Sequence, residues 1–228
     1  MKKALIVAAI AAATSSASAQ FVSGSSLNGV ELGLSAGYAS GLSGGAFVHV
    51  PNVAGPVGLR ASVDYVRPSD ALRDDVDVGA GSGLTLGTFG SFKGRGQATE
   101  SGSQTMLGLD GTYSLGEIAP GVDATAYAGG RYGRFSATET YAGSNANSQT
   151  TTTNAFGIGA GAMVSYALAG NISLFGDLGL DHYFPSTLSN GTDAGTYAPG
   201  EAGYNDVRSR FAFPGTVVKA KIGVKLSY

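Results

Sequence analysis

The most constraining feature of this chain is the strict alternation of apolar and polar residues over its last eleven positions, residues 218–228. Apolar side chains occupy every even position, from Val218 to Tyr228, and lysine, glycine or serine occupies every odd one. Successive side chains of a β-strand point to opposite sides, so this period of two predicts a strand with one apolar and one polar face. The pattern alone leaves open which face lies inside the fold.

The same alternation recurs along the chain and predicts eight strands in all. They span residues 30–38, 45–50, 57–65, 107–115, 122–133, 156–166, 172–182 and 218–228. Short connections fall at residues 39–44, 52–56, 116–121 and 167–171. Long polar stretches fall at residues 67–102, 135–154 and 185–215 and are expected to be loops. Within the second, residues 138–154 are rich in Thr, Ser and Asn and are expected to be a flexible display surface. Short turns at one end and long loops at the other are typical of outer-membrane barrels.

The first 19 residues have the organisation of an export signal. Lys2 and Lys3 precede a ten-residue apolar run, and Ala17-Ser18-Ala19 matches a small-residue cleavage site. We therefore expect residues 1–19 to be a signal peptide, residues 20–29 a periplasmic segment and residues 30–228 one β-barrel. The chain has 37 glycines, only 13% charged residues and no cysteine, which favours an exported all-β protein without disulfides. It has no basic stripe, so nucleic acid is not expected as a partner.

The positions of the aromatic residues indicate which face is outside. On the apolar faces, tyrosines and one phenylalanine fall at strand ends and leave the strand centres to aliphatic residues. Tyrosine favours the boundary between bilayer and water, so two such rows predict the aromatic girdles of a membrane barrel. The predicted girdle residues are Tyr38, Tyr65, Tyr113, Tyr132, Phe156, Tyr166 and Tyr228.

With the apolar face toward lipid, the polar face must fill the lumen. An eight-stranded barrel is just wide enough for side chains to fill it, and buried charges must be paired. The predicted lumen charge network comprises Glu31, Arg60, Asp64, Asp110, Asp123, Arg131, Asp177, Asp181, Lys219, Lys221 and Lys225. Inward glycines are expected to leave room for Tyr127, Phe175 and the long basic side chains. We expect a closed, ion-paired lumen.

These features together resemble the small outer-membrane β-barrel family, similar to the transmembrane domain of OmpA and to OmpX-like proteins. The resemblance covers residues 30–228 and implies an eight-stranded antiparallel transmembrane up-and-down β-barrel in the cell outer membrane. It implies as partners the outer-membrane lipid, a lipopolysaccharide-type surface and, through the C-terminal strand, the outer-membrane assembly machinery. The chain departs from the family in ending on Tyr228 where phenylalanine is usual, and in lacking tryptophan. We expect a monomer without a periplasmic peptidoglycan-binding domain.

The sequence carries no catalytic set, and we expect neither an enzyme nor a cofactor nor a resident metal. Residues 41–45 fit G-x-S-x-G, but no helix is predicted to follow and a hairpin turn explains them. His49 and His182 lie in separate strands, so both are interpreted as structural. The acidic residues Asp70, Asp74, Asp75 and Asp77 are interpreted as a solvated loop surface, with calcium binding as the alternative.

The functional hypothesis is envelope structure or surface interaction through the long extracellular loops. Three alternatives remain open at this point. They are a narrow porin-like channel for small solutes, a rim enzyme acting through His182 and Asp181, and a secreted soluble lipocalin-like carrier.

Overall fold

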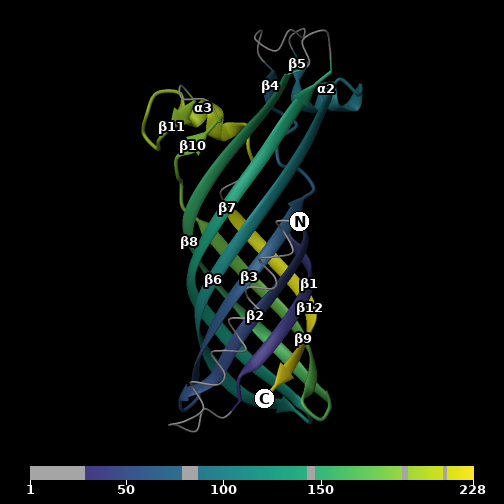
Figure 1. The fold of residues 1–228 in the computed structure, drawn as a ribbon, viewed down its shortest axis with the longest axis vertical. Helices are drawn as coiled ribbons and strands as arrows, with labels where there is room; N and C mark the ends of the chain where they lie inside the picture. Colours follow the sequence, from purple (N-terminus) through teal and green to yellow (C-terminus); the bar gives the residue numbers. More distant parts are fainter. Residues whose placement is uncertain (1–28, 79–86, 143–146, 192–194, 213–214) are drawn as a thin grey trace, which may run out of the picture.

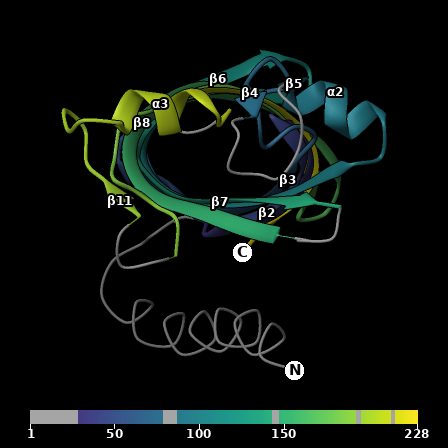
Figure 2. The same ribbon diagram turned by 90° about the horizontal axis from the view of Figure 1, so that it is seen from above.

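The computed structural model describes residues 29–78, 87–142, 147–191, 195–212 and 215–228. The expected signal peptide and most of the periplasmic segment lie outside these residues. Eight antiparallel strands form a closed ring, in which each strand pairs with the next and β12 pairs with both β9 and β1 (Figures 1 and 2). They are β1 (Glu31–Ala39), β2 (Gly41–Ala54), β3 (Val57–Pro68), β6 (Ala98–Ala119), β7 (Val122–Tyr141), β8 (Asn147–Ala169), β9 (Ile172–Tyr183) and β12 (Thr216–Ser227). The predicted eight-stranded up-and-down barrel is confirmed.

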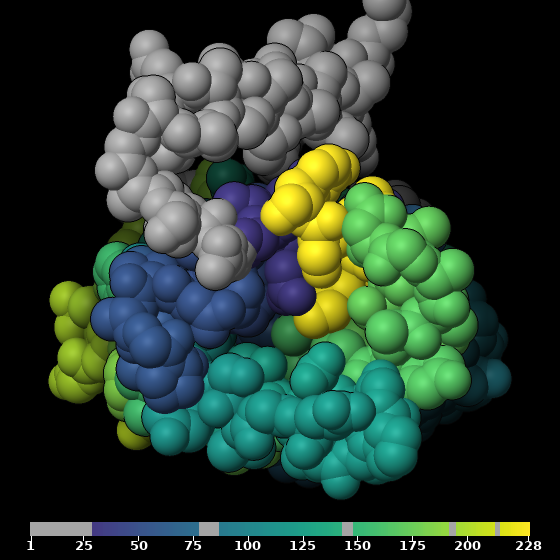
Figure 3. Space-filling view, turned by 90° about the horizontal axis from the view of Figure 1, so that it is seen from below, coloured from purple at the N-terminus to yellow at the C-terminus, as the bar shows by residue number. Residues whose placement is uncertain are grey.

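Tight turns close the end of the barrel where the chain terminates. Two residues each connect β2 to β3, β6 to β7 and β8 to β9. Gly55, Gly121 and Gly170 lie in these turns with positive φ, a conformation that glycine adopts without steric cost. Figure 3 views this periplasmic end, where the three turns and the end of β12 surround the barrel axis. At the opposite end β1 and β2 are joined by Ser40 alone, which has a φ of 59°.

The outer surface of the barrel is an apolar band. Aliphatic side chains on every strand point outward and are exposed, among them Leu34, Leu109, Leu178 and Ile222. Charged side chains at the level of this band, such as Arg60, Asp110 and Lys219, point inward and are buried. This inside-out distribution is the reverse of a soluble barrel and indicates that lipid covers the band. The predicted assignment of the two faces of residues 218–228 follows the same pattern, since Val218 is exposed and Lys219 is buried.

Three strands continue far beyond the band, which corrects the prediction of a long loop at residues 135–154. Strands β6, β7 and β8 contain 22, 20 and 23 residues, whereas about 9–11 residues suffice to cross a bilayer. Figure 1 shows them rising together above the other strands. The polar residues at 135–141 and 147–154 are therefore not a flexible loop, because they alternate with inward residues on paired strands, whereas residues 143–146 of the predicted loop lie outside the described residues.

The polarity of the side chains on both faces of the long strands changes at one level, which is the level of Tyr132 on β7. Below it the outward residues of β7 are small or apolar. Above it they are polar: Arg134, Ser136, Thr138 and Thr140. The inward residues change in the opposite sense, from Arg131 to Phe135 and Ala137, which are buried. Water replaces lipid outside the barrel at this level, so above it the sheet is organised like that of a soluble protein.

The extracellular segments cover the inward face of this extension. They contain β4 (Asp77–Val78), β5 (Gly87–Thr88), α2 (Phe89–Gly94), β10 (Leu188–Ser189), β11 (Thr196–Tyr197) and α3 (Tyr204–Ser209), with α2 and α3 on different parts of the rim (Figure 2). Leu72 and Phe211 form a β-bridge between the two longest segments. Both are buried in one apolar cluster with Phe89, Phe92 and Phe135. Among the described residues, no helix is long and apolar enough to cross a membrane.

Candidate functional site

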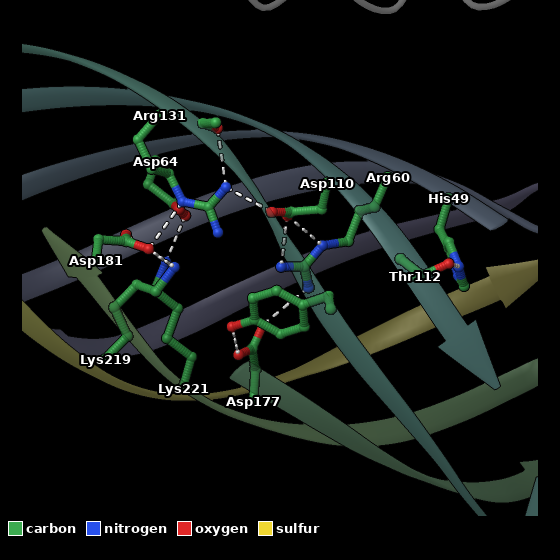
Figure 4. A network of polar contacts seen from close by, with 12 residues as sticks. His49, Arg60, Asp64, Asp110, Thr112, Arg131, Asp177, Asp181, Lys219 and Lys221 are labelled. Atoms are coloured by element: carbon green, nitrogen blue, oxygen red, sulfur yellow. Dashed lines mark hydrogen bonds and ion pairs between the residues drawn. The ribbon is translucent and has the colours of Figure 1, made fainter. Parts of the chain in front are cut away.

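The lumen of the barrel contains a continuous chain of charged contacts that joins five strands (Figure 4). Lys219 Nζ donates to Asp181 Oδ1 over 2.9 Å, and Arg131 Nε donates to the same oxygen over 2.8 Å. Arg131 Nη1 reaches Asp110 Oδ1 at 2.5 Å. Asp110 Oδ2 accepts from Arg60 Nη2 at 3.1 Å, and Arg60 Nη1 donates to Asp177 Oδ2 at 3.0 Å. The strands β3, β6, β7, β9 and β12 are thereby joined across the interior.

Tyr127 completes this chain. Its hydroxyl donates to Asp177 Oδ1 over 2.5 Å, and the Arg60 guanidinium lies 3.7 Å from the centre of its ring. Gly161 and Gly179, on neighbouring strands, lie beside the Tyr127 hydroxyl, and a methyl group at either position would overlap it. The glycines therefore provide the space that the tyrosine occupies, as the sequence predicts.

Two further ion-pair clusters lie outside this chain. Lys221 Nζ lies 2.6 Å from Asp64 Oδ1, within the same level of the lumen. Near the periplasmic end, Lys225 Nζ donates to Glu31 Oε1 over 2.7 Å, and His49 Nδ1 lies 2.8 Å from Glu31 Oε2. This second cluster joins β12 to β1, as expected for closure of the barrel. His49 is held as a structural residue between Glu31 and Thr112.

The buried charges balance. Five predicted acids (Glu31, Asp64, Asp110, Asp177 and Asp181) contact the five predicted bases (Arg60, Arg131, Lys219, Lys221 and Lys225). Asp123 is the exception among the eleven predicted residues and corrects the prediction. It is exposed because it is the second residue of β7, two positions after the turn residue Gly121, where the barrel opens to water.

An apolar layer lies above the charged one. The Phe135 and Tyr183 rings pack edge to face with centroids 5.0 Å apart, and Val66 and Met106 are buried in the same cluster. A smaller apolar layer of Phe47, Met163 and Phe175 lies in the lower part of the lumen. Charged and apolar layers thus alternate along the axis.

Two buried glutamates hold the extracellular segments in place. Glu100 of β6 accepts the backbone N–H groups of Ala71 and Leu72 at 2.9 and 2.8 Å, and it also pairs with Lys93 of α2. The hydrogen bond to Glu100 raises the pKa of Lys93 above its ordinary value. Glu139 of β7 accepts two hydrogen bonds from Arg210 Nη2, at 2.8 and 3.1 Å.

The Glu139 carboxylate also accepts a hydrogen bond from the Tyr141 hydroxyl over 2.8 Å. Burial, together with this bond, raises the pKa of Tyr141. Three of the four acidic loop residues contact nearby cations. Asp70 and Asp74 contact Lys93, and Asp75 contacts Arg73. Within the described ranges, no three metal-ligating side chains form a group that fits a metal ion.

The predicted girdle residues all lie exposed on the outer face. They are Tyr38, Tyr65, Tyr132 and Phe156 toward the extracellular end, and Tyr113, Tyr166 and Tyr228 toward the periplasmic end. Tyr132 and Phe156 are cross-strand partners with ring centroids 5.1 Å apart. His182 points outward with its Nδ1 2.9 Å from Thr216 Oγ1, whereas Asp181 points into the lumen, so the two do not form a joint site.

The fold, together with the outward apolar band and the charged lumen, defines a small outer-membrane β-barrel protein. A crystal structure of a major outer membrane protein from Thermus thermophilus matches 88% of this chain and 99% of its own, with a TM-score of 0.76 and 31% sequence identity. The chain belongs to the same family as this Thermus protein. The expectation of a small outer-membrane barrel is thereby confirmed, and the alternative of a secreted soluble carrier is not supported.

Other solved barrels are more distant. The N-terminal β-barrel domain of Pseudomonas aeruginosa OprF has a TM-score of 0.39 at 16% identity, covering 88% of this chain and 98% of its own. Acinetobacter baumannii CarO has a TM-score of 0.42 at 14% identity, covering 88% and 97%. No protein-family model matches the chain, and no curated protein matches it by sequence.

Sequence reasoning missed Glu100 and Glu139 as functional residues. Both lie in stretches whose polar composition predicts loops. Glu100 shares one strand face with Ala98 and Gly102, and Glu139 shares one with Ala137 and Tyr141. This period of two indicates strands, but the threonine and serine residues on the opposite face make the stretches look uniformly polar.

Proposed function

We propose that this protein is a closed, non-enzymatic outer-membrane anchor that presents a folded extracellular sheet and its loops for envelope structure or surface interaction. The observation that carries the proposal is the unbroken chain of contacts from Lys219 through Asp110 to Tyr127. Its charged members are between 1% and 9% exposed. Such charges are stable only when paired, so an ion passing the lumen would have to separate them.

The apolar layer of Phe135 and Tyr183 supports the same conclusion. It lies between the charged layer and the extracellular solvent, and its members are almost completely buried. A permeating solute would therefore meet an aromatic constriction as well as the ionic one. The narrow-channel alternative has no comparable observation in its favour among the described residues.

The extension of β6, β7 and β8 supports a role at the cell surface. These strands carry loops that are packed on an apolar core and are held by Glu100 and Glu139. A rigid, elevated platform favours contact with other surface components over a purely lipid-embedded role. We further propose outer-membrane lipid and a lipopolysaccharide-type surface as partners of the exposed band, recognition of the strand ending at Tyr228 by the assembly machinery, and a monomeric protein.

Planar-bilayer recordings test the closed lumen. We expect the purified wild-type protein to insert without single-channel steps, in a bilayer where a general porin gives steady steps as a positive control. A variant carrying Asp110→Ala and Arg131→Ala removes a neutral pair from the centre of the chain and serves to show whether a gap there admits ions. Steady, reproducible steps from the wild type would contradict the proposal and favour the narrow channel.

A further inference from the structure

Two arginines differ from the other cations of the barrel wall. Arg67 of β3 and Arg134 of β7 are exposed, and neither makes an ion pair, a side-chain hydrogen bond or a ring contact within the part of the chain that the structure describes. The lumen cations and Lys93 all have carboxylate partners. Arg67 and Arg134 are therefore cations for which the described part of the protein supplies no counter-charge.

Both arginines occupy the same place relative to the outer girdle. Each follows a girdle tyrosine by two residues on a strand that runs outward, in Tyr65-Val66-Arg67 and Tyr132-Gly133-Arg134. Val66 is completely buried and faces inward, so Tyr65 and Arg67 share the outward face. The same argument places Arg134 with Tyr132, because Phe135 next to it is buried.

The sheet register brings these two positions together around β6. Thr105 pairs with Tyr65 on one side and with Arg134 on the other. The Arg67 and Arg134 backbones are thus separated by two strand spacings, roughly 10 Å, across the sheet and by two residues, roughly 7 Å, along the strand. Long arginine side chains bridge such a span to a ligand that lies over Thr105.

The surroundings of the two arginines fit an anion. The outward residues between and beside them on β6 and β7 are Ser103, Thr105 and Ser136, which offer hydroxyl donors. The described outward residues of β3, β6 and β7 above the girdle include no acidic side chain. Below Tyr132, the next outward residues of β7 are the small Gly130 and Ala128. A Cβ atom added at Gly130 would meet no other atom within 4 Å.

We propose that Arg67 and Arg134 bind the phosphate headgroup of an outer-leaflet lipid. This inference rests on the membrane orientation given in the proposed function. It assigns a lipid phosphate group to one place on the outer surface of the barrel. Guanidinium groups bind phosphate through paired, charge-assisted hydrogen bonds, and the site lies at headgroup level because the tyrosines below it mark the bilayer boundary. Thr105 and Ser103 supply further donors, and an acyl chain of the same lipid lies over the shallow stripe at Gly130 and Ala128.

Native mass spectrometry of the detergent-solubilised protein with added diphosphorylated lipid A tests this site. The variants are Arg67→Gln, Arg134→Gln and the double variant. Arg73→Gln is the matched control, because it removes the same charge from an exposed loop position. We expect the lipid dissociation constant to rise about fivefold for each single variant and about 25-fold for the double variant, with no change in the control. Unheated gel mobility establishes that each variant is folded.

Three results would overturn the inference. The first is a double variant that binds lipid A as tightly as the wild type does, and the second is equal binding of lipid A stripped of both phosphates. The third is displacement of the lipid by millimolar inorganic phosphate, which would indicate a site for the free ion. Channel activity of the wild type in the bilayer recordings would refute the closed lumen and leave the lipid site standing, so the two proposals fail separately.

Discussion

Glu100 and Glu139 are direct cross-strand partners on β6 and β7, and both point into the extracellular end of the barrel. Two like charges opposite each other destabilise a sheet unless each is compensated. Here the compensating cations come from different segments, Lys93 from the segment between β3 and β6 and Arg210 from the segment between β9 and β12. One acidic pair therefore fixes both of the longest extracellular segments above the lumen.

Removing one of these carboxylates should release one segment. We expect Glu100→Gln to weaken the attachment of residues 69–78, because the backbone N–H groups of Ala71 and Leu72 and the Lys93 ammonium lose a charged acceptor. A hydrogen bond to a charged group contributes about 1.5–3 kcal/mol, so trypsin cleavage at Arg73 should become about tenfold faster or more. Asp75→Asn is the control, since it removes an exposed ion pair that contributes about 0–1 kcal/mol. Equal cleavage rates in both variants would argue against the anchoring role.

The raised pKa of Lys93 predicts how this anchor responds to pH. The folded state holds the lysine proton more tightly than the unfolded chain does, so the contribution to stability is complete below the ordinary lysine pKa of 10.5 and is lost only as the pH rises through the higher folded value. Protection of the segment against proteinase K should therefore stay constant from pH 8 to pH 10. Lys93→Met should lower the protection at every pH in this range. Loss of wild-type protection between pH 8 and pH 10 would contradict the prediction.

The centre of the lumen should be intolerant of unpaired charge. Asp110 is about 1% exposed and lies between Arg60 and Arg131, so Asp110→Asn leaves two buried guanidinium groups without a carboxylate between them. We expect a loss of about 3–5 kcal/mol in the free energy of unfolding, measured by urea titration in lipid vesicles. Asp123→Asn, at an exposed position of β7, should change it by less than about 0.5 kcal/mol. Similar losses in both variants would show that Asp110 has no special position.

Glycines of the inner and outer faces should differ in their tolerance of a methyl group. An added Cβ at Gly159 would overlap the contact between Asp181 and Arg131, whereas one at Gly130 would meet no atom within 4 Å. We expect Gly159→Ala to cost about 1–3 kcal/mol and Gly130→Ala to be close to neutral in the same titration. The reverse order would mean that the assignment of these faces is incorrect.

The alternation of residues 218–228, repeated along the chain, predicted the strands of the barrel, and the aromatic residues at the strand ends predicted which face is outside. Of the eleven predicted lumen residues, the structure places all but Asp123 in ion pairs inside the barrel. The pattern worked because lipid outside and charge inside impose opposite chemistry on adjacent residues. The prediction was wrong where that contrast disappears. Above Tyr132 water lies outside, so polar residues on the outer face made residues 135–154 resemble a loop.

Particular contacts also lay beyond the reach of the sequence. The alternation predicts that the side chains of Asp110 and Arg131 both point into the lumen. Whether these two side chains contact each other depends on the shear between the strands, which is known only from the strand register. The β-bridge between Leu72 and Phe211, and the pairing of Thr105 with both Tyr65 and Arg134, join segments far apart in the chain. No local pattern encodes such distances.

The central claim, that the apolar faces meet lipid while the charged faces fill a closed lumen, can be measured with a single introduced tryptophan, because the chain has none of its own. Leu109 is 65% exposed on the outer face, and Phe47 is 7% exposed inside the barrel at a neighbouring register step. In vesicles with brominated acyl chains, Leu109→Trp fluorescence should be strongly quenched. Phe47→Trp, or Phe175→Trp if the first variant does not fold, should resist both brominated lipid and aqueous acrylamide. Lipid quenching of the inner tryptophan, or acrylamide quenching of the outer one without lipid quenching, would contradict the account.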